Sequence, residues 1–225
     1  MWLFNSSVGR KLVMSVSGVG LVLFLVFHLA MNAVAVFSAS AYNAICAQLG
    51  ANWYAVLLSL GLAALFVVHI LYALYISHIN WRACGGRQRY EFSARPKGVS
   101  WASQNMLVLG AIVVLFLLVH LSHFWRHMMF AELVGSHGAF DPANGAAYID
   151  YYFKGHFFTT LLYLLWYGAL WQHLTHGIWS AMQTLGLNNG HWLRRWQRIS
   201  MVGASVICGA FALITIIFFV RGAGW

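Results

Sequence analysis

Histidines inside apolar stretches are the residues of this sequence best suited to chemistry. His28, His69, His120 and His176 each lie in a run of hydrophobic residues long enough to cross a bilayer. An ionisable side chain in hydrocarbon is costly and usually serves a function. Imidazole is a common axial ligand of haem iron, and helix bundles build such sites from facing side chains. Four such histidines therefore predict two haems, each held by two imidazoles.

The composition places the chain in the membrane class. Of its 225 residues, 61% are hydrophobic and 8% are charged, whereas soluble domains carry about 25% charged residues. The net charge is +9, but the positions of these charges indicate membrane orientation rather than nucleic-acid binding. None of the three cysteines lies in a CxxC or CxxCH motif. Any haem would therefore be held by coordination and packing, as haem b.

Five apolar runs predict an all-α membrane protein with five transmembrane helices, four of which form a haem-binding bundle. Each run exceeds the roughly 20 residues that a helix needs to span hydrocarbon. The whole chain, 1–225, is read as a single domain, with helices at about 12–37, 53–79, 101–125, 156–185 and 199–220. An uncharged loop, a basic loop, a long loop and a second basic loop are expected between them. The long loop has room for a short interfacial helix around MMFAELV.

The basic residues predict the orientation of these helices. Ten lysines and arginines lie at the N-terminus and in the second and fourth loops, against three on the opposite side. Cytoplasmic segments of membrane proteins carry the excess of basic residues. We therefore expect a cytoplasmic N-terminus and an external C-terminus.

Orientation sorts the histidines by depth. The helices that carry His28 and His120 run outward and place both residues in the outer half, whereas His69 and His176 fall in the inner half. At a rise of 1.5 Å per residue, the two levels differ by on the order of 10 Å. Two histidines per iron leave no open coordination position, which suits electron transfer. His173 shares a helix face with His176 and remains an alternative at the inner level.

Further polar residues could bind the two carbonyl groups of a quinone, at either of two locations. The inner candidates are Ser17, Trp101, Gln104 and Gln183, and the outer candidates are Asn32, Asn43, His123 and His127. The outer location is preferred, because electrons would then use both haem levels. Imidazole also titrates near physiological pH, which makes a histidine the expected proton handler.

Motifs along nearly the whole chain resemble the b558-type di-haem cytochrome b subunit of succinate:quinone oxidoreductases. The matching stretches are SSVGRKLVMSVSG, FLVFHLAMN, AYNAICAQLGANWYA, VVHILYAL, GVSWASQNMLVLG, LVHLSHFW, MMFAEL and HLTHGIWSAMQTLGLNN. The end of the last stretch, from the HG pair to the two asparagines, is the most specific.

The resemblance implies a multi-pass anchor and electron-transfer subunit in the bacterial cytoplasmic (inner) membrane, serving the succinate dehydrogenase step of the tricarboxylic acid cycle. It implies an iron–sulfur subunit and a flavoprotein subunit as partners, with the flavin chemistry on the latter. It implies two haem b groups and a membrane quinone, with menaquinone expected, and it leaves oligomerisation of the complex open. As iron ligands it implies His28 with His120 and His69 with His176, preferring His176 over His173.

The sequence departs from some family members at two positions that carry glutamate in them. The first loop has no acid here, and Leu174 stands two residues before the histidine of the HG pair. These differences favour succinate oxidation with reduction of menaquinone over the reverse reaction. The competing hypotheses are a cytochrome b subunit of another quinone-linked dehydrogenase and a haem-free anchor or transporter. A visible spectrum separates the haem-free class from the others.

Overall fold

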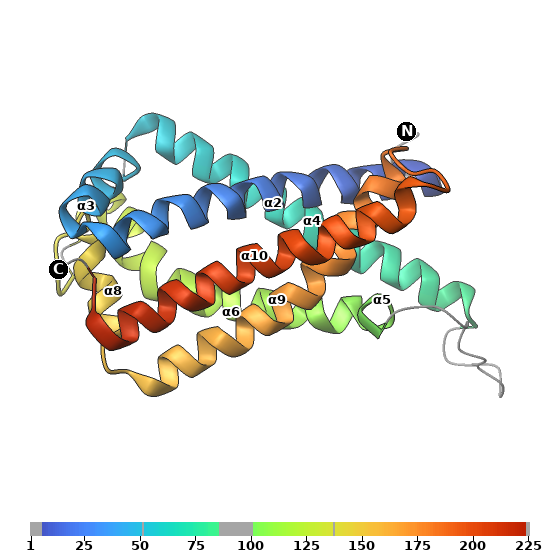
Figure 1. Ribbon diagram of the computed structural model, residues 1–225. Helices are drawn as coiled ribbons and strands as arrows, with labels where there is room; N and C mark the ends of the chain where they lie inside the picture. The colour runs from blue at the N-terminus through green and yellow to red at the C-terminus, as the bar shows by residue number, and fades with distance from the viewer. Residues whose placement is uncertain (1–5, 51, 86–100, 137, 224–225) are drawn as a thin grey trace.

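The computed structural model describes the chain except for residues 1–5, 51, 86–100, 137 and 224–225, and every regular element in the described part is helical. The long helices lie lengthwise beside one another (Figure 1). They are α2 (Ser7–Phe37), α4 (Trp53–Ala83), α6 (Met106–His120), α9 (Phe157–Thr184) and α10 (Trp192–Arg221). The shorter ones are α3 (Ala39–Gln48), α5 (Trp101–Gln104), α7 (Ala131–Leu133) and α8 (Gly145–Phe153), and a π-helical segment, η1 (Leu121–Phe130), joins α6 to α7.

The helices and their long apolar stretches confirm the predicted class, an all-α, multi-pass membrane protein. Four helical segments among the described residues are long and apolar enough to cross a membrane, namely Ser7–Phe37, Trp53–Ala83, Met106–Leu133 and Trp192–Arg221. The fifth long helix, α9, has 28 residues, but threonine, histidine and glutamine side chains make its most apolar stretch less hydrophobic than theirs.

The connections contain more helix than the sequence indicated. The uncharged first loop forms α3, because the Ser38 side chain accepts a hydrogen bond from the Ala41 amide at 3.1 Å and caps the helix. In the long connection, MMFAELV is helical as expected, but it is the end of the continuous η1–α7 segment and not a helix of its own. The separate short helix is α8, where the Asn144 side chain accepts from the Ala147 amide at 3.2 Å.

Several helix ends also differ from the expected ones. The first helix begins at Ser7, because the Ser6 hydroxyl accepts from the Gly9 amide at 2.8 Å. The third helix is interrupted at Asn105, between α5 and α6. The last helix begins at Trp192, so Arg194, Arg195 and Arg198 lie in its first turns instead of in a loop. Most of the basic second loop, with Arg87, Arg89, Arg95 and Lys97, lies outside the described residues.

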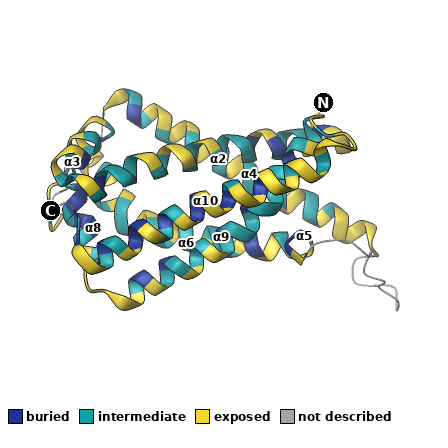
Figure 2. Cartoon of the chain, viewed as in Figure 1, coloured by how far each residue is buried: buried dark blue, intermediate teal, exposed yellow. Residues whose placement is uncertain are grey.

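The bundle is packed unevenly. α9 and α10 contact each other along much of their length, and α2 contacts α4, α9 and α10, whereas α4 has little contact with α6. In the most apolar stretch of α10, 39% of the residues are buried, against 6% in the other three candidate spans. Figure 2 shows the exposed residues on the outward faces of the rods. Large apolar side chains on these faces suit contact with lipid.

The two ends of the bundle carry different elements (Figure 1). The N-terminal end of α2, α5 and the α9–α10 turn lie at one end, which we call the α5 end. α3, α8 and the C-terminal end of α10 lie at the other, which we call the α8 end. Helix direction therefore alternates between long helices that follow one another in the chain, as the sequence predicted.

Candidate functional site

α2 and α6 bring His28 and His120 together near the α8 end. Their ring centres are 5.7 Å apart and the rings are perpendicular. Aromatic rings surround the pair: Phe24 and Phe211 lie 5.5 and 5.9 Å from His28, and Trp166 lies 5.7 Å from His120. These rings hold both imidazoles in place and keep water from them.

A chain of polar contacts leads from this pair toward α8. The hydroxyl of Tyr163 lies 3.5 Å from Nδ1 of His120 and 3.1 Å from Nδ1 of His123. His123 in turn stacks on Tyr152 of α8, with ring centres 4.2 Å apart. Both His123 and the more distant His127 lie in η1, the π-helical segment, a geometry that is common at functional sites. His120 is thereby linked to the α8 end through side chains.

The second pair lies nearer the α5 end and joins α4 to α9. His69 faces His173, with ring centres 6.4 Å apart, and Nδ1 of His69 lies 3.1 Å from the Ser17 hydroxyl. His176, the expected partner of His69, instead has its ring against Trp179 at 5.0 Å. The structure thus brings His69 to the histidine that the sequence left as the alternative.

Glycines make room for these imidazoles. A Cβ added at Gly18 would lie 3.3 Å from Cε1 of His69, and one added at Gly110 would lie 3.5 Å from Cε1 of His173. The Nδ1 atoms of His173 and His176 are buried and have no hydrogen-bond partner among the described residues. Leaving a buried polar atom without a partner costs about 1–3 kcal/mol.

The distance between the two pairs follows from residue positions along α2 and α6. On α2, Ser17, which contacts His69, precedes His28 by eleven residues, or about 16 Å of helix. On α6, Gly110, which lies beside His173, precedes His120 by ten residues, or about 15 Å. The pairs therefore lie at two levels about 15 Å apart along the bundle.

The outer quinone candidates have different surroundings. Asn43 is fully engaged, because its Nδ2 donates to Asn144 Oδ1 at 2.9 Å and its Oδ1 accepts from the Ala146 amide at 3.0 Å. Asn32 donates to the His28 carbonyl at 2.8 Å and lies 3.3 Å from Nε2 of the same histidine. His127 stacks on Tyr148, with ring centres 5.8 Å apart. Asn43 thus holds α3 to α8, whereas His123 and His127 stack on the α8 tyrosines Tyr152 and Tyr148.

The inner candidates do not gather at one cavity. A cavity of about 280 Å³ between α2 and α4 includes Ser17 but not Trp101, Gln104 or Gln183. Its lining is otherwise apolar and consists of Leu12, Val13, Val16, Leu65 and Val68. Trp101 and Gln183 are exposed. The inner set is therefore spread over the α5 end.

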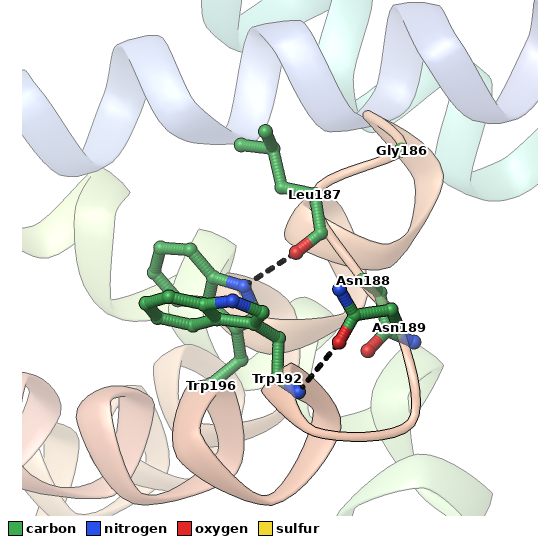
Figure 3. A pocket seen from close by; sticks show the side chains of 6 residues that line it. All are labelled: Gly186, Leu187, Asn188, Asn189, Trp192 and Trp196. Atoms are coloured by element: carbon green, nitrogen blue, oxygen red, sulfur yellow. Dashed lines mark hydrogen bonds between the residues drawn. The ribbon is translucent and has the colours of Figure 1, made fainter.

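A second cavity of about 300 Å³ lies at the α9–α10 turn (Figure 3). It is lined by Gly186, Leu187, Asn188, Asn189, Trp192 and Trp196. Gly186 has φ 79°, which suits a helix end. Asn189 Oδ1 accepts from the Trp192 amide at 3.0 Å, and the Trp196 indole donates to the Leu187 carbonyl at 2.7 Å. The LGLNN end of the most specific motif thus ends one helix and caps the next.

The sequence reading missed Tyr163 and Trp166, both of which touch His120. They lie on α9 at spacing i, i+3 and so share one helix face. A tyrosine inside an apolar run must find a hydrogen-bond partner for its hydroxyl. That requirement could have marked Tyr163 as a candidate neighbour of a histidine.

Searches of protein families, curated proteins and solved structures find no match to this chain. Function is therefore inferred from the residues and their geometry. In the part of the chain that the structure describes, no three histidine, cysteine or acidic side chains form a metal-binding group. Histidines in pairs fit a haem iron better than a closed zinc site, which takes four ligands, and glycines leave room beside the rings of His69 and His173.

Proposed function

We propose that this chain is the di-haem membrane anchor of a succinate:quinone oxidoreductase in the bacterial cytoplasmic membrane. The carrying observation is the presence of two histidine pairs at levels about 15 Å apart in one apolar bundle, in a sequence whose motifs resemble that family. Bound haem b would supply a one-electron redox centre at each level, between an iron–sulfur subunit and membrane quinone, expected to be menaquinone. The flavin chemistry belongs to a flavoprotein subunit.

The proposed axial ligands are His28 with His120, and His69 with His176. His28 and His120 would hold one haem between them, because α2 and α6 bring their ring centres to 5.7 Å from each other. His173 competes with His176 because its ring lies 6.4 Å from that of His69.

We propose that α9 also crosses the membrane, which brings the number of transmembrane helices to five and makes α9 the fourth in chain order. Its polar side chains find partners inside the bundle: the Tyr167 hydroxyl lies 3.0 Å from Thr215 Oγ1, and the Trp171 indole donates to Ser205 Oγ at 2.9 Å. Polar groups in hydrocarbon must be satisfied internally, and here α10 supplies those partners. Contacts of α9 with α2, α6 and α10 support the same position.

The α5 end is proposed to face the cytoplasm and the iron–sulfur subunit. Basic residues at that end support this orientation, and those within the described part are Arg10, Lys11, Arg82, Arg194, Arg195 and Arg198. The C-terminus at the opposite end would be external.

The quinone site is proposed at the α8 end, beside His123. This side chain is half-buried and shares the Tyr163 hydroxyl with His120, so it combines access with a link to the outer pair. The task of this chain there is to bind the quinone carbonyl and to hold or release a proton at the imidazole.

The first experiment is a haem count. The complex, expressed with its partner subunits, should contain two haem b per anchor chain by its reduced spectrum and by pyridine haemochrome. Absence of haem would overturn the proposed function and favour a haem-free anchor or transporter.

The second experiment tests the quinone site. His123→Gln should keep both haems and lower succinate:quinone turnover by about 100-fold, the lower range for loss of a positioned proton donor. His127→Gln is measured beside it. Full activity in both variants, with loss in Gln104→Ala, would move the site to the α5 end.

A further inference from the structure

A buried hydroxyl group contacts one histidine of each pair. Ser17 of α2 lies 3.1 Å from Nδ1 of His69, and Tyr163 of α9 lies 3.5 Å from Nδ1 of His120. The two hydroxyl-bearing residues are 2% and 3% exposed. In both cases the hydroxyl contacts Nδ1 of the imidazole and not Nε2.

The direction of the hydrogen bond to His69 follows from counting protons. A serine hydroxyl has one proton to donate, and that of Ser17 is donated to the Met14 carbonyl oxygen at 3.0 Å. Toward His69, therefore, the hydroxyl can only accept. Nδ1 of His69 must carry the proton, and the lone pair of the neutral ring is then on Nε2.

Tyr163 stands between two imidazoles and also has one proton. It lies 3.1 Å from Nδ1 of His123 and 3.5 Å from Nδ1 of His120. Hydrogen bonds donated by hydroxyl groups are shorter than those donated by N–H groups, and we therefore infer that the phenolic proton is donated along the shorter contact, to His123. Tyr163 then accepts from His120, so His120 also carries its proton on Nδ1 and its lone pair on Nε2.

We propose that Ser17 and Tyr163 are positioning residues that fix the tautomers of His69 and His120, so that each offers Nε2 to iron. This inference rests on the proposed function, because the iron is that of the proposed haems. A histidine ligand that donates its other N–H to a partner is held in orientation and becomes more basic. Ser17 is thereby assigned to ligand orientation instead of quinone binding.

The other member of each pair lacks such support. Asn32 lies 3.3 Å from Nε2 of His28, and Nδ1 of His176, like that of its competitor His173, has no hydrogen-bond partner in the described part of the chain. Each level therefore combines one imidazole oriented by a hydroxyl with one that is not, and the two hydroxyl groups can be removed independently.

The test compares Ser17→Ala with Tyr163→Phe in the complete complex, each variant serving as the control for the other. Redox titration and the low-spin ferric signal in electron paramagnetic resonance are recorded for both haems. Ser17→Ala should raise the potential and shift the signal of the haem at the α5 end only, because the ligand becomes less basic. Tyr163→Phe should do the same at the α8 end only. Ser17→Thr should restore the wild-type values.

The outcomes separate this inference from the proposed function. A wild-type complex without haem would refute both. Two wild-type haems, with potentials and signals unchanged in both variants, would refute the inference alone, as would one variant that moves both haems equally. Loss of only the α5-end haem in Ser17→Ala, with recovery in Ser17→Thr, would support it.

Discussion

The two histidine pairs place the same side chain in opposite surroundings. His28 and His120 are enclosed by aromatic rings, including Trp166 at 5.7 Å. His69 and His173 stand beside Gly18 and Gly110, and α4, which carries His69, has little contact with α6. Aromatic packing fixes the spacing of the first pair by itself. Beside the second pair stand glycines, which have no side chain to fix the spacing of the rings. That spacing should therefore depend more on a group bound between the two imidazoles.

The largest effects are expected from removing single imidazoles. His28→Ala and His120→Ala should each reduce the haem content from two to one by eliminating the α8-end haem, and His69→Ala should eliminate the other. Reduced spectra and redox titration would identify the haem that remains. Loss of the same haem from His28→Ala and His69→Ala would show that these two histidines do not belong to separate ligand pairs.

The same measurement decides between the two neighbouring histidines of α9. His173 has the ring contact with His69, whereas the resemblance favours His176. Only the variant that removes the ligand, His173→Ala or His176→Ala, should lose the α5-end haem. Retention of both haems in both variants would contradict a ligand from this part of α9.

A medium effect is expected from filling the space beside His69. Gly18→Val adds its first carbon 3.3 Å from Cε1 of His69, whereas a Cβ at Gly61 of α4 meets nothing within 4 Å. Overpacking costs about 1–3 kcal/mol, so Gly18→Val should weaken retention of the α5-end haem by about 10-fold while sparing the other. Haem content after detergent washing measures this, with Gly61→Val as the matched control. Equal loss from both variants would show a general packing defect.

The smallest effect is a difference in labelling of two native cysteines, which tests which end of the bundle faces the cytoplasm. Cys84 is exposed at the end of α4, and Cys46 is half-buried in α3, near the α8 end. Burial raises the pKa of the Cys46 thiol, so less of it is the reactive thiolate. In intact cells, an impermeant maleimide should label Cys46 slowly, and faster at higher pH, and should leave Cys84 unlabelled until the cells are permeabilised. Peptide mass spectrometry reads both sites. Rapid labelling of Cys84 in intact cells would reverse the proposed orientation.

Depth along apolar runs was enough to predict which histidines meet at the α8 end. His28 and His120 lie at similar depths on helices of the same direction, and their rings are neighbours. The choice between His173 and His176 was not accessible in this way, since they are three residues apart on one helix face. Their difference depends on how α4 approaches α9, which is a property of tertiary packing.

A hydropathy pattern shows where a helix leaves the hydrocarbon layer. It does not show where the helix itself begins or ends. Arg194, Arg195 and Arg198 looked like a loop, but arginine is a good helix former and all three lie in α10. Tyr163 was overlooked because an apolarity count treats it as one more aromatic residue. Only the position of its hydroxyl, between two imidazoles, distinguishes it.

If α9 spans the membrane as proposed, its polarity has a consequence for how the chain is inserted during synthesis. A translocon passes a segment into lipid according to its apolarity, and α9 is the long helix least suited to enter alone. Its partners Ser205 and Thr215 are on α10, which leaves the ribosome afterwards. The two helices, joined by the capped turn at Gly186–Asn189, would therefore enter as a hairpin. A chain truncated before α10 should leave α9 outside the bilayer, so integration is complete only with the last helix.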